Sequence, residues 1–332
     1  MKFINIRRAT AIGAGVLVLA GVTVSCSGST SGQAGAPLEK PSITVCDFPT
    51  IDSAGLFIAK MKGYFQQQGL TVAIKYEPFS QQAVTDQEGG KCDISSADYV
   101  TYVDDEVLHD ANLRIIAEAS FLQPGQIGLL TSPRYSVESV SDLAGKTIAV
   151  AQRGDIATLL VDSLLAEYGV AQSSVIFKPG TPLNTAPAAL HAGEVVAAPV
   201  PEPFLTEGEE SYGLTAVADI DQGGSVNFPV QGFAVTAAWA RQYPGTLRAF
   251  TTALNEGQEQ ADTDRALVED AIEEFLGIKP ETAALIALPN YPLGVDAQRL
   301  QRVPDAMLRF GLLPGKDASF TIASMIYAAP AG

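Results

Sequence analysis

Ser42-Ile-Thr-Val-Cys-Asp-Phe48 is a short β-rich run, and Ser53 then opens a helical stretch that ends at Gly63. The same unit of a strand followed by a helix occurs twice more downstream. Its strands are Leu70-Thr-Val-Ala-Ile-Lys-Tyr76 and Cys92-Asp-Ile-Ser95, and its helices begin at Ser80 and Asp98. Strands that alternate with helices favour right-handed crossovers and a largely parallel sheet.

A second series of strands and helices begins near Ile127. Its predicted strands are 127–131, 146–151, 175–177 and 195–198, and its helices run from Asp155 to Gly169 and from Thr185 to Gly193. Ala186 to Glu202 repeats the order found from Ala83 to Asp98, which is helix, glycine, strand and acidic residue. Either the chain has two similar α/β lobes, or this likeness is what any two α/β segments show.

The C-terminal third reads as one strand followed by helices. Gln231-Gly-Phe-Ala-Val-Thr236 is the strand, and the predicted helices are 237–262, 266–276, 280–288, 296–310 and 319–327. Close to 290 residues after the N-terminal segment favour two lobes of ordinary size. We therefore expect residues 42–130 and 231–332 to form lobe one and residues 131–230 to form lobe two. The two crossing strands would make a hinge beside a cleft, with the C-terminal helices packed on lobe one.

The N-terminus resembles a bacterial lipoprotein signal. Lys2, Arg7 and Arg8 precede an apolar run from Ala11 to Val22, and Cys26 follows small residues. The resemblance implies a signal peptide over residues 1–25, lipidation of Cys26, and a flexible tether over residues 26–41. The alternative is a membrane-spanning helix, but the run is shorter than the roughly 20 apolar residues that a span needs.

The composition is that of a globular, acidic protein. The 332 residues are 47% hydrophobic and 17% charged, with a formal net charge of −16. Nucleic acid is not an expected partner, because phosphate binding draws on clustered Lys and Arg that this chain lacks. Cys46 and Cys92 either form a disulfide in an oxidising compartment or stay buried as free thiols.

Candidate binding residues follow from their positions after strands. In a parallel sheet, the loops at the carboxyl ends of the strands line the crevice, and helix N-termini point free N–H groups into it. The ligand-binding residues selected in this way are Asp52, Ser53, Ser96, Asp98, Gln152, Arg153, Gly154, Asp155, Glu202 and Phe204, with Ser80 also at the rim. The alternative is that each of these residues only caps the N-terminus of its helix and contacts no ligand.

These candidates predict different ligands. Arg153 is the positive group best placed for a carboxylate, sulfonate or phosphate, although it could be an exposed arginine. Asp52, Asp98, Asp155 and Glu202 favour a ligand that carries N–H donors instead. Aromatic side chains near the same edges could add an apolar floor or belong to the core; they are Phe48, Phe121, Phe204 and Phe228.

The sequence gives little support for catalysis. His109 and His191 lie in helical stretches, without metal-ligand spacing and without an obvious nucleophile. The motifs HExxH, GxSxG, GxxxxGK[ST] and CxxC are absent. We expect no catalytic residue, no metal and no cofactor, and the remaining catalytic option is an acid and base pair such as Asp98 with Glu202.

An ordered series of motifs carries a family resemblance between about Ser42 and Asp262. The motifs are Ala54-Gly-Leu-Phe-Ile-Ala-Lys-Met-Lys-Gly-Tyr-Phe65, Gly69-Leu-Thr-Val72, Gly90-Lys-Cys-Asp-Ile-Ser95, Asp142-Leu-Ala-Gly-Lys-Thr-Ile-Ala-Val150 and Glu202-Pro-Phe204. They resemble the sulfonate, nitrate, taurine and thiamine-pyrimidine group of periplasmic binding proteins, whose fold is the type II form with two Rossmann-like lobes. The resemblance implies a monomeric ABC-importer lipoprotein at the outer face of the cell membrane, which delivers a small solute to a permease.

The resemblance also implies that Ser53, Ser96, Asp98, Gln152 to Asp155 and Glu202 border the solute. Asp98 stands where many sulfonate binders have a small neutral residue, which argues against a purely anionic ligand. A pyrimidine, a flavin-like ring and an amino-sulfonate such as taurine stay open. Two other functions also stay open: an exported enzyme of the same fold acting on a pyrimidine or similar molecule, and a surface sensor.

Overall fold

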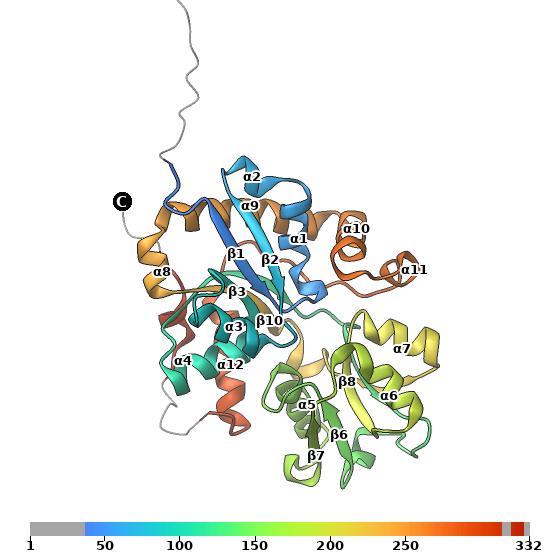
Figure 1. Ribbon diagram of the computed structural model, residues 1–332. Helices are drawn as coiled ribbons and strands as arrows, with labels where there is room; N and C mark the ends of the chain where they lie inside the picture. Colours follow the sequence, from blue (N-terminus) through green and yellow to red (C-terminus); the bar gives the residue numbers. More distant parts are fainter. Residues whose placement is uncertain (1–36, 314–319, 329–332) are drawn as a thin grey trace, which may run out of the picture. The chain divides into compact units, whose positions relative to one another are not determined.

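The computed structural model describes residues 37–313 and 320–328, and within them the strands form two five-stranded sheets (Figure 1). The first sheet has the order β2-β1-β3-β10-β4, and the second has the order β7-β6-β8-β5-β9. The strands of the first sheet are β1 (Ser42–Asp47), β2 (Thr71–Tyr76), β3 (Ile94–Asp98), β4 (Leu113–Phe121) and β10 (Pro229–Thr236). Those of the second are β5 (Ile127–Thr131), β6 (Thr147–Val150), β7 (Ile176–Pro179), β8 (Ala197–Pro201) and β9 (Thr215–Asp219).

Helices connect and cover the strands of both sheets. Around the first sheet lie α1 (Ala54–Met61), α2 (Tyr64–Gln67), α3 (Ser80–Glu88), α4 (Tyr99–His109), α8 (Ala237–Gln242), α9 (Pro244–Thr263), α10 (Arg265–Leu276), α11 (Pro280–Ala283) and α12 (Ala297–Arg309). Around the second lie α5 (Ile156–Glu167), α6 (Ala186–Ala192) and α7 (Phe204–Tyr212). Each sheet with its helices is called a lobe below.

The two sheets share one layout. In each, three neighbouring strands are parallel, and the fourth runs antiparallel to both of its neighbours. The antiparallel strand is the one that follows a passage from the other sheet: β10 lies between β3 and β4, and β5 lies between β8 and β9. The prediction of two matched α/β lobes is confirmed. Four of the five strands in each sheet run in the same direction, and the sequence did not predict the antiparallel direction of the remaining strand, β10 or β5.

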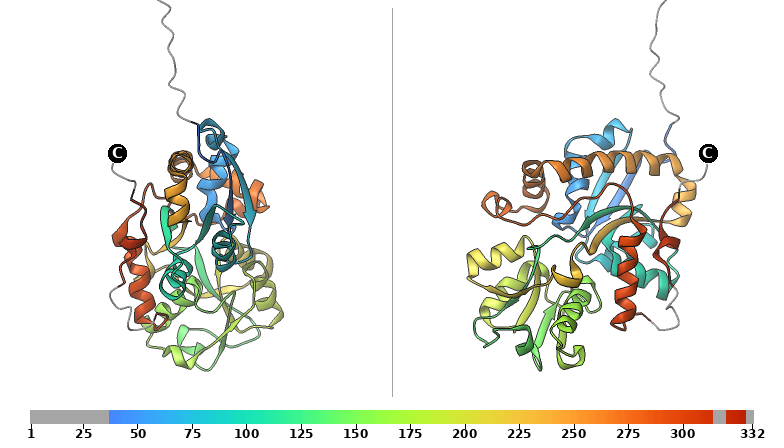
Figure 2. Two further views of the ribbon diagram at one scale, coloured as in Figure 1. Left: turned by 60° about the vertical axis from the view of Figure 1, so that its left-hand side comes forward. Right: turned by 180° about the vertical axis from the view of Figure 1, so that it is seen from behind.

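Two separate apolar layers cover the first sheet. Phe233 and Val235 of β10 pack in one cluster with α1, α9 and α10, whereas Ala234 packs on the other face with α4 and α12. In the view from behind in Figure 2, α9 (orange) runs across the upper part of the first lobe and α12 (red) lies below it. The C-terminal helices therefore pack on lobe one, as expected. The second cluster continues to Leu159 and Leu160 of α5, which joins the two lobes.

The chain passes between the sheets twice. The first crossing is residues 122–126, between β4 and β5, and the second is residues 220–228, between β9 and β10. The two crossings lie side by side, since the backbone N–H of Leu122 donates to the carbonyl of Phe228 at 2.9 Å. β5 belongs to the second sheet from Ile127 onward, and β10 belongs to the first from Pro229. The lobe boundaries near residues 130 and 231 stay predictions.

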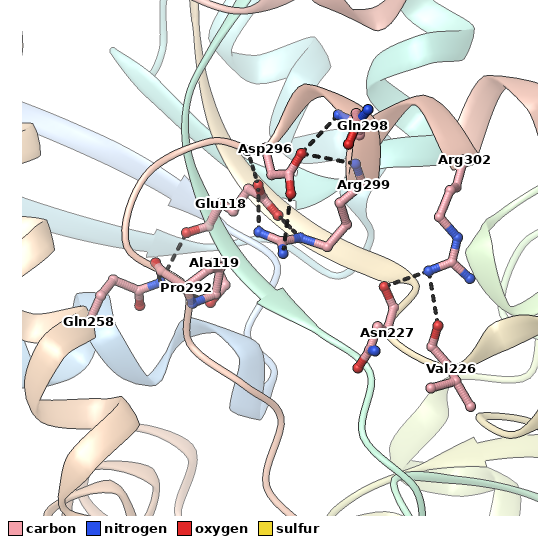
Figure 3. A network of polar contacts seen from close by, with 10 residues as sticks. All are labelled: Glu118, Ala119, Val226, Asn227, Gln258, Pro292, Asp296, Gln298, Arg299 and Arg302. Atoms are coloured by element: carbon pink, nitrogen blue, oxygen red, sulfur yellow. Dashed lines mark hydrogen bonds and ion pairs between the residues drawn. The ribbon is translucent and has the colours of Figure 1, made fainter.

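Helix α12 contacts strand β4, which precedes the first crossing, and the loop of the second crossing (Figure 3). Arg299 donates two hydrogen bonds to the fully buried carboxylate of Glu118 on β4, at 2.8 and 3.0 Å, and its guanidinium lies 4.4 Å from the ring centre of Phe121. One turn later, Arg302 donates to three carbonyls of the second crossing, at 2.7 to 2.9 Å; they belong to Gly224, Val226 and Asn227. Two arginines on one helix face thus fix the strand before the first crossing and the loop of the second.

Cys46 and Cys92 form a disulfide with Cα atoms 5.7 Å apart. The sequence left open whether the two cysteines form a disulfide or stay as free thiols, and the structure has the disulfide. It joins β1 to the residues just before β3, which is the neighbouring strand of the same sheet.

Several elements differ from the prediction. The strands β4 and β9 were not predicted, because charged residues such as Arg114 and Glu118 and several alanines obscure the period of β4. The helix expected over 237–262 is divided at Pro244, which lacks an N–H and starts α9 instead. The helix over 280–288 ends at Ala283, and within 320–328 only a 3-10 turn at Ile322–Met325 is present.

The tether boundary also needs correction. Residues 37–41 lie inside the expected tether, yet Glu39 accepts hydrogen bonds from the backbone N–H groups of Gly245 and Thr246 at 3.0 and 2.8 Å. Lys40 forms an ion pair with Asp93. The predicted signal peptide, Cys26 and the tether up to residue 36 lie outside the described residues. Among the described helices, none combines the length and the hydropathy that crossing a bilayer requires.

We predict that Arg299→Gln lowers the free energy of unfolding by about 3–5 kcal/mol, because it leaves the buried Glu118 carboxylate without its cation. Urea denaturation measures this loss. The double variant Arg299→Gln with Glu118→Gln should recover most of it. Glu269→Gln, which removes an exposed ion pair with Arg265, should cost at most about 1 kcal/mol. A loss for Arg299→Gln no larger than that of Glu269→Gln would contradict the prediction.

The disulfide gives a second prediction for stability. Cys46 and Cys92 are 46 residues apart in sequence, so replacing both by serine releases a long loop in the unfolded chain. The loss should be about 3–4 kcal/mol in urea denaturation. Reducing the wild-type protein should lower its stability by a similar amount, and should leave the serine variant unchanged.

Candidate functional site

A cavity of about 90 Å³ lies where the carboxyl ends of the parallel strands of both lobes meet. Residues that follow β1, β2 and β3 line it from one side, and residues that follow β6 and β8 line it from the other. This is the edge at which α/β sheets bind ligands. We call it the inner chamber, and it is lined by Phe48, Thr50, Ile51, Asp52, Phe79, Ser80, Asp98, Leu122, Gln126, Ile127, Ala151, Gln152, Asp155, Ile156, Ala157, Leu183, Pro199, Pro201, Glu202, Val230 and Gln231.

Four carboxyl groups line the inner chamber, two from each lobe. Asp52 follows β1 and Asp98 ends β3, while Asp155 follows β6 and Glu202 follows β8. The strands β1 and β6 hold the same place in their sheets, and so do β3 and β8. The two lobes thus place acids at matching positions, which is what the repeated sequence pattern around Asp98 and Glu202 indicated.

Three of these acids cap helices through a nearby threonine. Asp98 accepts from the backbone N–H and the hydroxyl of Thr101, both at 2.9 Å, and Asp155 accepts from Thr158 in the same way at 2.9 Å. Glu202 accepts from the N–H and hydroxyl of Thr206 at 3.1 and 2.8 Å. Because the acid stands at the helix N-terminus, the free N–H groups and the helix dipole stabilise its charge.

Gln231 forms the floor between the lobes. It lies on β10, opposite Asp98 in the strand register, and its side-chain amide donates to the hydroxyls of Ser53 and Ser96 at 2.9 and 2.7 Å. Its carbonyl oxygen accepts from the hydroxyl of Thr50 at 3.0 Å, or that hydroxyl donates to Asp52 at 2.7 Å. The buried Gln231 therefore fixes the rim of lobe one.

Burial raises the pKa of every carboxyl group in the chamber. For Asp155 it raises the pKa to about 6, and the nearby charge of Asp98 adds to the effect, against the hydrogen bonds from Thr158 and Gln152. The pKa values of Asp52, Asp98 and Glu202 are also raised, in each case mainly by burial. Beneath the chamber, burial raises the pKa of Asp47 to about 6 as well. Neutral donors alone offset the desolvation of these groups only in part.

Half of the predicted binding residues line the inner chamber: Asp52, Asp98, Gln152, Asp155 and Glu202. Ser53 and Ser96 are fully buried behind Gln231 and orient it. Arg153 is exposed, and neither it nor Gly154 lines the chamber. Whether any of these residues binds a solute stays a prediction.

A larger cavity of about 410 Å³ adjoins the inner chamber and shares Phe48, Phe79 and Glu202 with it. We call it the outer cavity. Its wall includes five aromatic side chains; they are Phe48, Tyr76, Phe79, Phe204 and Phe275. The predicted residue Phe204 lies here. Phe121 and Phe228 lie under the guanidinium groups of Arg299 and Arg302 and line neither cavity.

Sequence reasoning missed three polar residues of the chamber, Thr50, Gln126 and Gln231. Gln231 could have been found, because it begins the predicted apolar strand 231–236. A polar residue in such a strand is buried only when it has hydrogen-bond partners, so it indicates a polar cluster. Gln126 lies in the first crossing, where its carbonyl oxygen accepts from the N–H of Gln123 at 2.7 Å. No local pattern marked it.

Among the described residues, one group of metal-ligating types lies close together: Cys46, Glu77 and Cys92. Both cysteines belong to the disulfide, so neither sulfur is free as a thiolate ligand.

Comparison with known families and structures gives two results. A model of the family described as NMT1/THI5 like matches residues 50–264. A comparison with curated protein sequences finds no significant match.

Solved structures share the fold at low sequence identity. The alkanesulfonate-binding protein SsuA from Xanthomonas axonopodis pv. citri, bound to MOPS, has a TM-score of 0.72 and 20% identity, over 86% of this chain and 98% of that one. The periplasmic nitrate-binding protein NrtA from Synechocystis PCC 6803 has a TM-score of 0.71 and 15% identity, over 84% of each chain. The CA3427 gene product of Candida albicans, described as having the generic periplasmic binding protein fold, has a TM-score of 0.73 and 16% identity, over 87% and 97%. These likenesses confirm the predicted two-lobed periplasmic binding protein fold.

The raised pKa of Asp155 predicts a gain in stability for Asp155→Asn. A carboxyl whose pKa is higher in the folded state, about 6 against a usual 3.8, loses stability as the pH rises through that interval. Asparagine keeps a capping oxygen without the charge. The unliganded variant should therefore be about 1–2 kcal/mol more stable than the wild type at pH 7.5, and nearly equal to it at pH 4.

The measurement is urea denaturation at both pH values. The matched control is Asp142→Asn, since Asp142 is exposed and hydrogen bonds from Ser139 and the backbone lower its pKa. That variant should gain nothing at pH 7.5. Equal stability of wild type and Asp155→Asn at pH 7.5 would contradict the prediction.

Proposed function

The chain belongs to the NMT1/THI5-like family, and from this premise we propose that it is the solute-binding component of an ABC importer. In this proposal the protein captures one small organic solute between its lobes, as a monomer, and delivers it unchanged to a membrane permease. Two of the structures that share its fold are named for binding an alkanesulfonate and nitrate. For this chain, the class of solute follows from its own cavity.

The observation that supports this proposal most directly is the cavity between the lobes. Both sheets contribute their ligand-binding edge to the same chamber, and the chain crosses there twice over short segments. Two lobes joined by short crossings can open and close around a ligand. The acids, Gln152 and Gln231 supply polar contacts from both sides, so closure would complete the site.

The cellular location is part of the proposal. The lipoprotein-like N-terminus supports lipidation at Cys26, removal of residues 1–25, and anchoring at the outer face of the cell membrane. The Cys46–Cys92 disulfide supports the same compartment, since disulfides persist in oxidising surroundings.

One observation favours an alternative, an exported enzyme of the same fold. Asp98 and Asp155 line one chamber from opposite lobes and both have raised pKa values, which is a property of acid and base catalysts. The fate of the solute separates the two functions.

The experiment is to purify the protein without denaturation and identify bound small molecules by native mass spectrometry. The identified solute is then added to unliganded protein and recovered. Recovery of unchanged solute, together with a raised melting temperature, supports the transport function. A chemically altered solute would support the enzyme, and the absence of binding by any solute would overturn both.

We predict that Glu202→Gln weakens binding of that solute about tenfold, since glutamine keeps an acceptor for Thr206 but removes a charge from the chamber. Calorimetry measures the affinity, and urea denaturation checks that the unliganded fold is retained. Glu209→Gln on the exposed side of the same helix is the control and should bind like the wild type. Equal affinity of Glu202→Gln and the wild type would exclude this role for Glu202.

A further inference from the structure

The charge of the inner chamber has one sign. Asp52, Asp98, Asp155 and Glu202 line it, and no Lys, Arg or His is among its lining residues. Arg153, the positive group nearest in sequence, is exposed and lies outside the lining. An anionic ligand in this chamber would meet four carboxylates and no cation, which is an unfavourable arrangement in a partly desolvated site.

The chamber acids have no counter-ion within the described part of the chain. None of the four carboxylates lies within 4.0 Å of a basic nitrogen there. Some buried acids elsewhere in the described chain are paired with cations, namely Glu118 with Arg299, Asp93 with Lys40, and Asp86 with Lys75 and Lys91. Asp47, Asp162 and Asp221, like the chamber acids, have no such partner in that part of the chain. Within the described residues, the chamber therefore has two buried carboxyl groups, Asp98 and Glu202, and two half-buried ones, Asp52 and Asp155, and only neutral groups donate hydrogen bonds to them.

These carboxylates can still accept hydrogen bonds. A carboxylate has about four lone-pair sites. Asp98 uses its two oxygens for Thr101, and Asp52 uses its two for Thr50 and Ser120, at one hydrogen bond each. Both carboxylates therefore have lone pairs left to accept hydrogen bonds from a ligand. A positively charged donor forms the strongest hydrogen bonds with them.

The outer cavity adds an apolar wall to this acidic end. Phe48 and Phe79 line both cavities, and Tyr76, Phe204 and Phe275 extend the aromatic surface outward. Aromatic faces bind flat or aliphatic groups, and they also attract cations. The two cavities together thus have a negatively charged polar end and a large apolar end.

We propose that the solute is an organic cation, whose protonated nitrogen lies among Asp52, Asp98, Asp155 and Glu202 and whose apolar body lies against the aromatic wall of the outer cavity. This inference rests on the proposed function and names the class of its solute. It separates this chain from the sulfonate-binding and nitrate-binding structures of the same fold, which are named for anions. The acidity of the whole chain, with a net charge of −16, would also attract cations.

The test compares ligands that differ only in charge. The probes are 2-phenylethylammonium, 2-phenylethanol and 2-phenylethanesulfonate, together with the same three charge classes on aliphatic and heteroaromatic skeletons. Each is added to unliganded protein, and the melting temperature and calorimetric affinity are measured. We expect cations to bind at least about tenfold more tightly than neutral molecules of the same shape, and anions not to bind.

Two variants test whether the acids of the inner chamber cause the preference for cations. Asp98→Asn and Asp155→Asn should each weaken binding of cations about tenfold, and should leave binding of neutral molecules unchanged or improved. Asp155→Asn is expected to fold at least as well as the wild type, so weaker binding by it does not reflect misfolding. Asp142→Asn, outside both cavities, is the control and should bind like the wild type.

The pH gives an independent readout. The pKa of Asp155 is about 6 in the unliganded protein, Asp98 faces it, and Asp52 and Glu202 are the other charged groups that line the chamber. Lowering the pH from 7.5 to 5 protonates Asp155, so the affinity for a cation should fall several-fold, whereas the affinity for an anion would rise. Asp155→Asn should show a weaker dependence on pH.

The outcomes distinguish this inference from the proposed function. Tight binding of an anion, as a probe or a co-purifying solute, would overturn the inference that the solute is a cation. Equal binding of the neutral and cationic probes would overturn it as well. Neither result would contradict the proposed transport function. A cation whose affinity is unchanged in both Asn variants would also overturn the inference. If no solute of any charge class binds, the proposed function fails and the inference fails with it.

Discussion

The position of β10 is the constraint on which the other features depend. This strand comes late in the sequence but lies inside the first sheet, between β3 and β4 and antiparallel to both. The chain must therefore return from the second lobe before the first sheet is complete. Because β10 starts at the second crossing, its first residues face the gap between the lobes, and Gln231 becomes the floor of the inner chamber.

The same side chains build the helices and the site. Asp98, Asp155 and Glu202 cap α4, α5 and α7, and the hydrogen bonds that they accept from threonines stabilise both the helix starts and the charges. Without those bonds, burial of so many acids in one chamber would be far more costly. The hydrogen bonds offset the cost of this charge in part, and a positively charged solute, as we propose, would offset more of it.

The sequence predicted the parts of this arrangement that depend on local rules. An acid between a strand and a helix is recognisable, and matching positions in two repeats suggested that Asp98 and Glu202 border one cleft. It could not predict the direction of a side chain: Arg153 follows β6 as Asp155 does, yet it is exposed and does not line the inner chamber. Nor could it place Phe121 and Phe228, which lie under arginines of a helix some 70 to 180 residues away along the chain. Such contacts depend on the fold of the whole lobe, not on neighbours in sequence.

The late position of β10 also has a consequence for the order of folding. β3 and β4 pair with β10 and not with each other, so each has an edge of unpaired backbone groups until β10 is added. The strands of the second lobe lie in one continuous segment, from Ile127 to Asp219, and need no distant part of the chain. We therefore expect the second lobe to fold before the interrupted first lobe is complete.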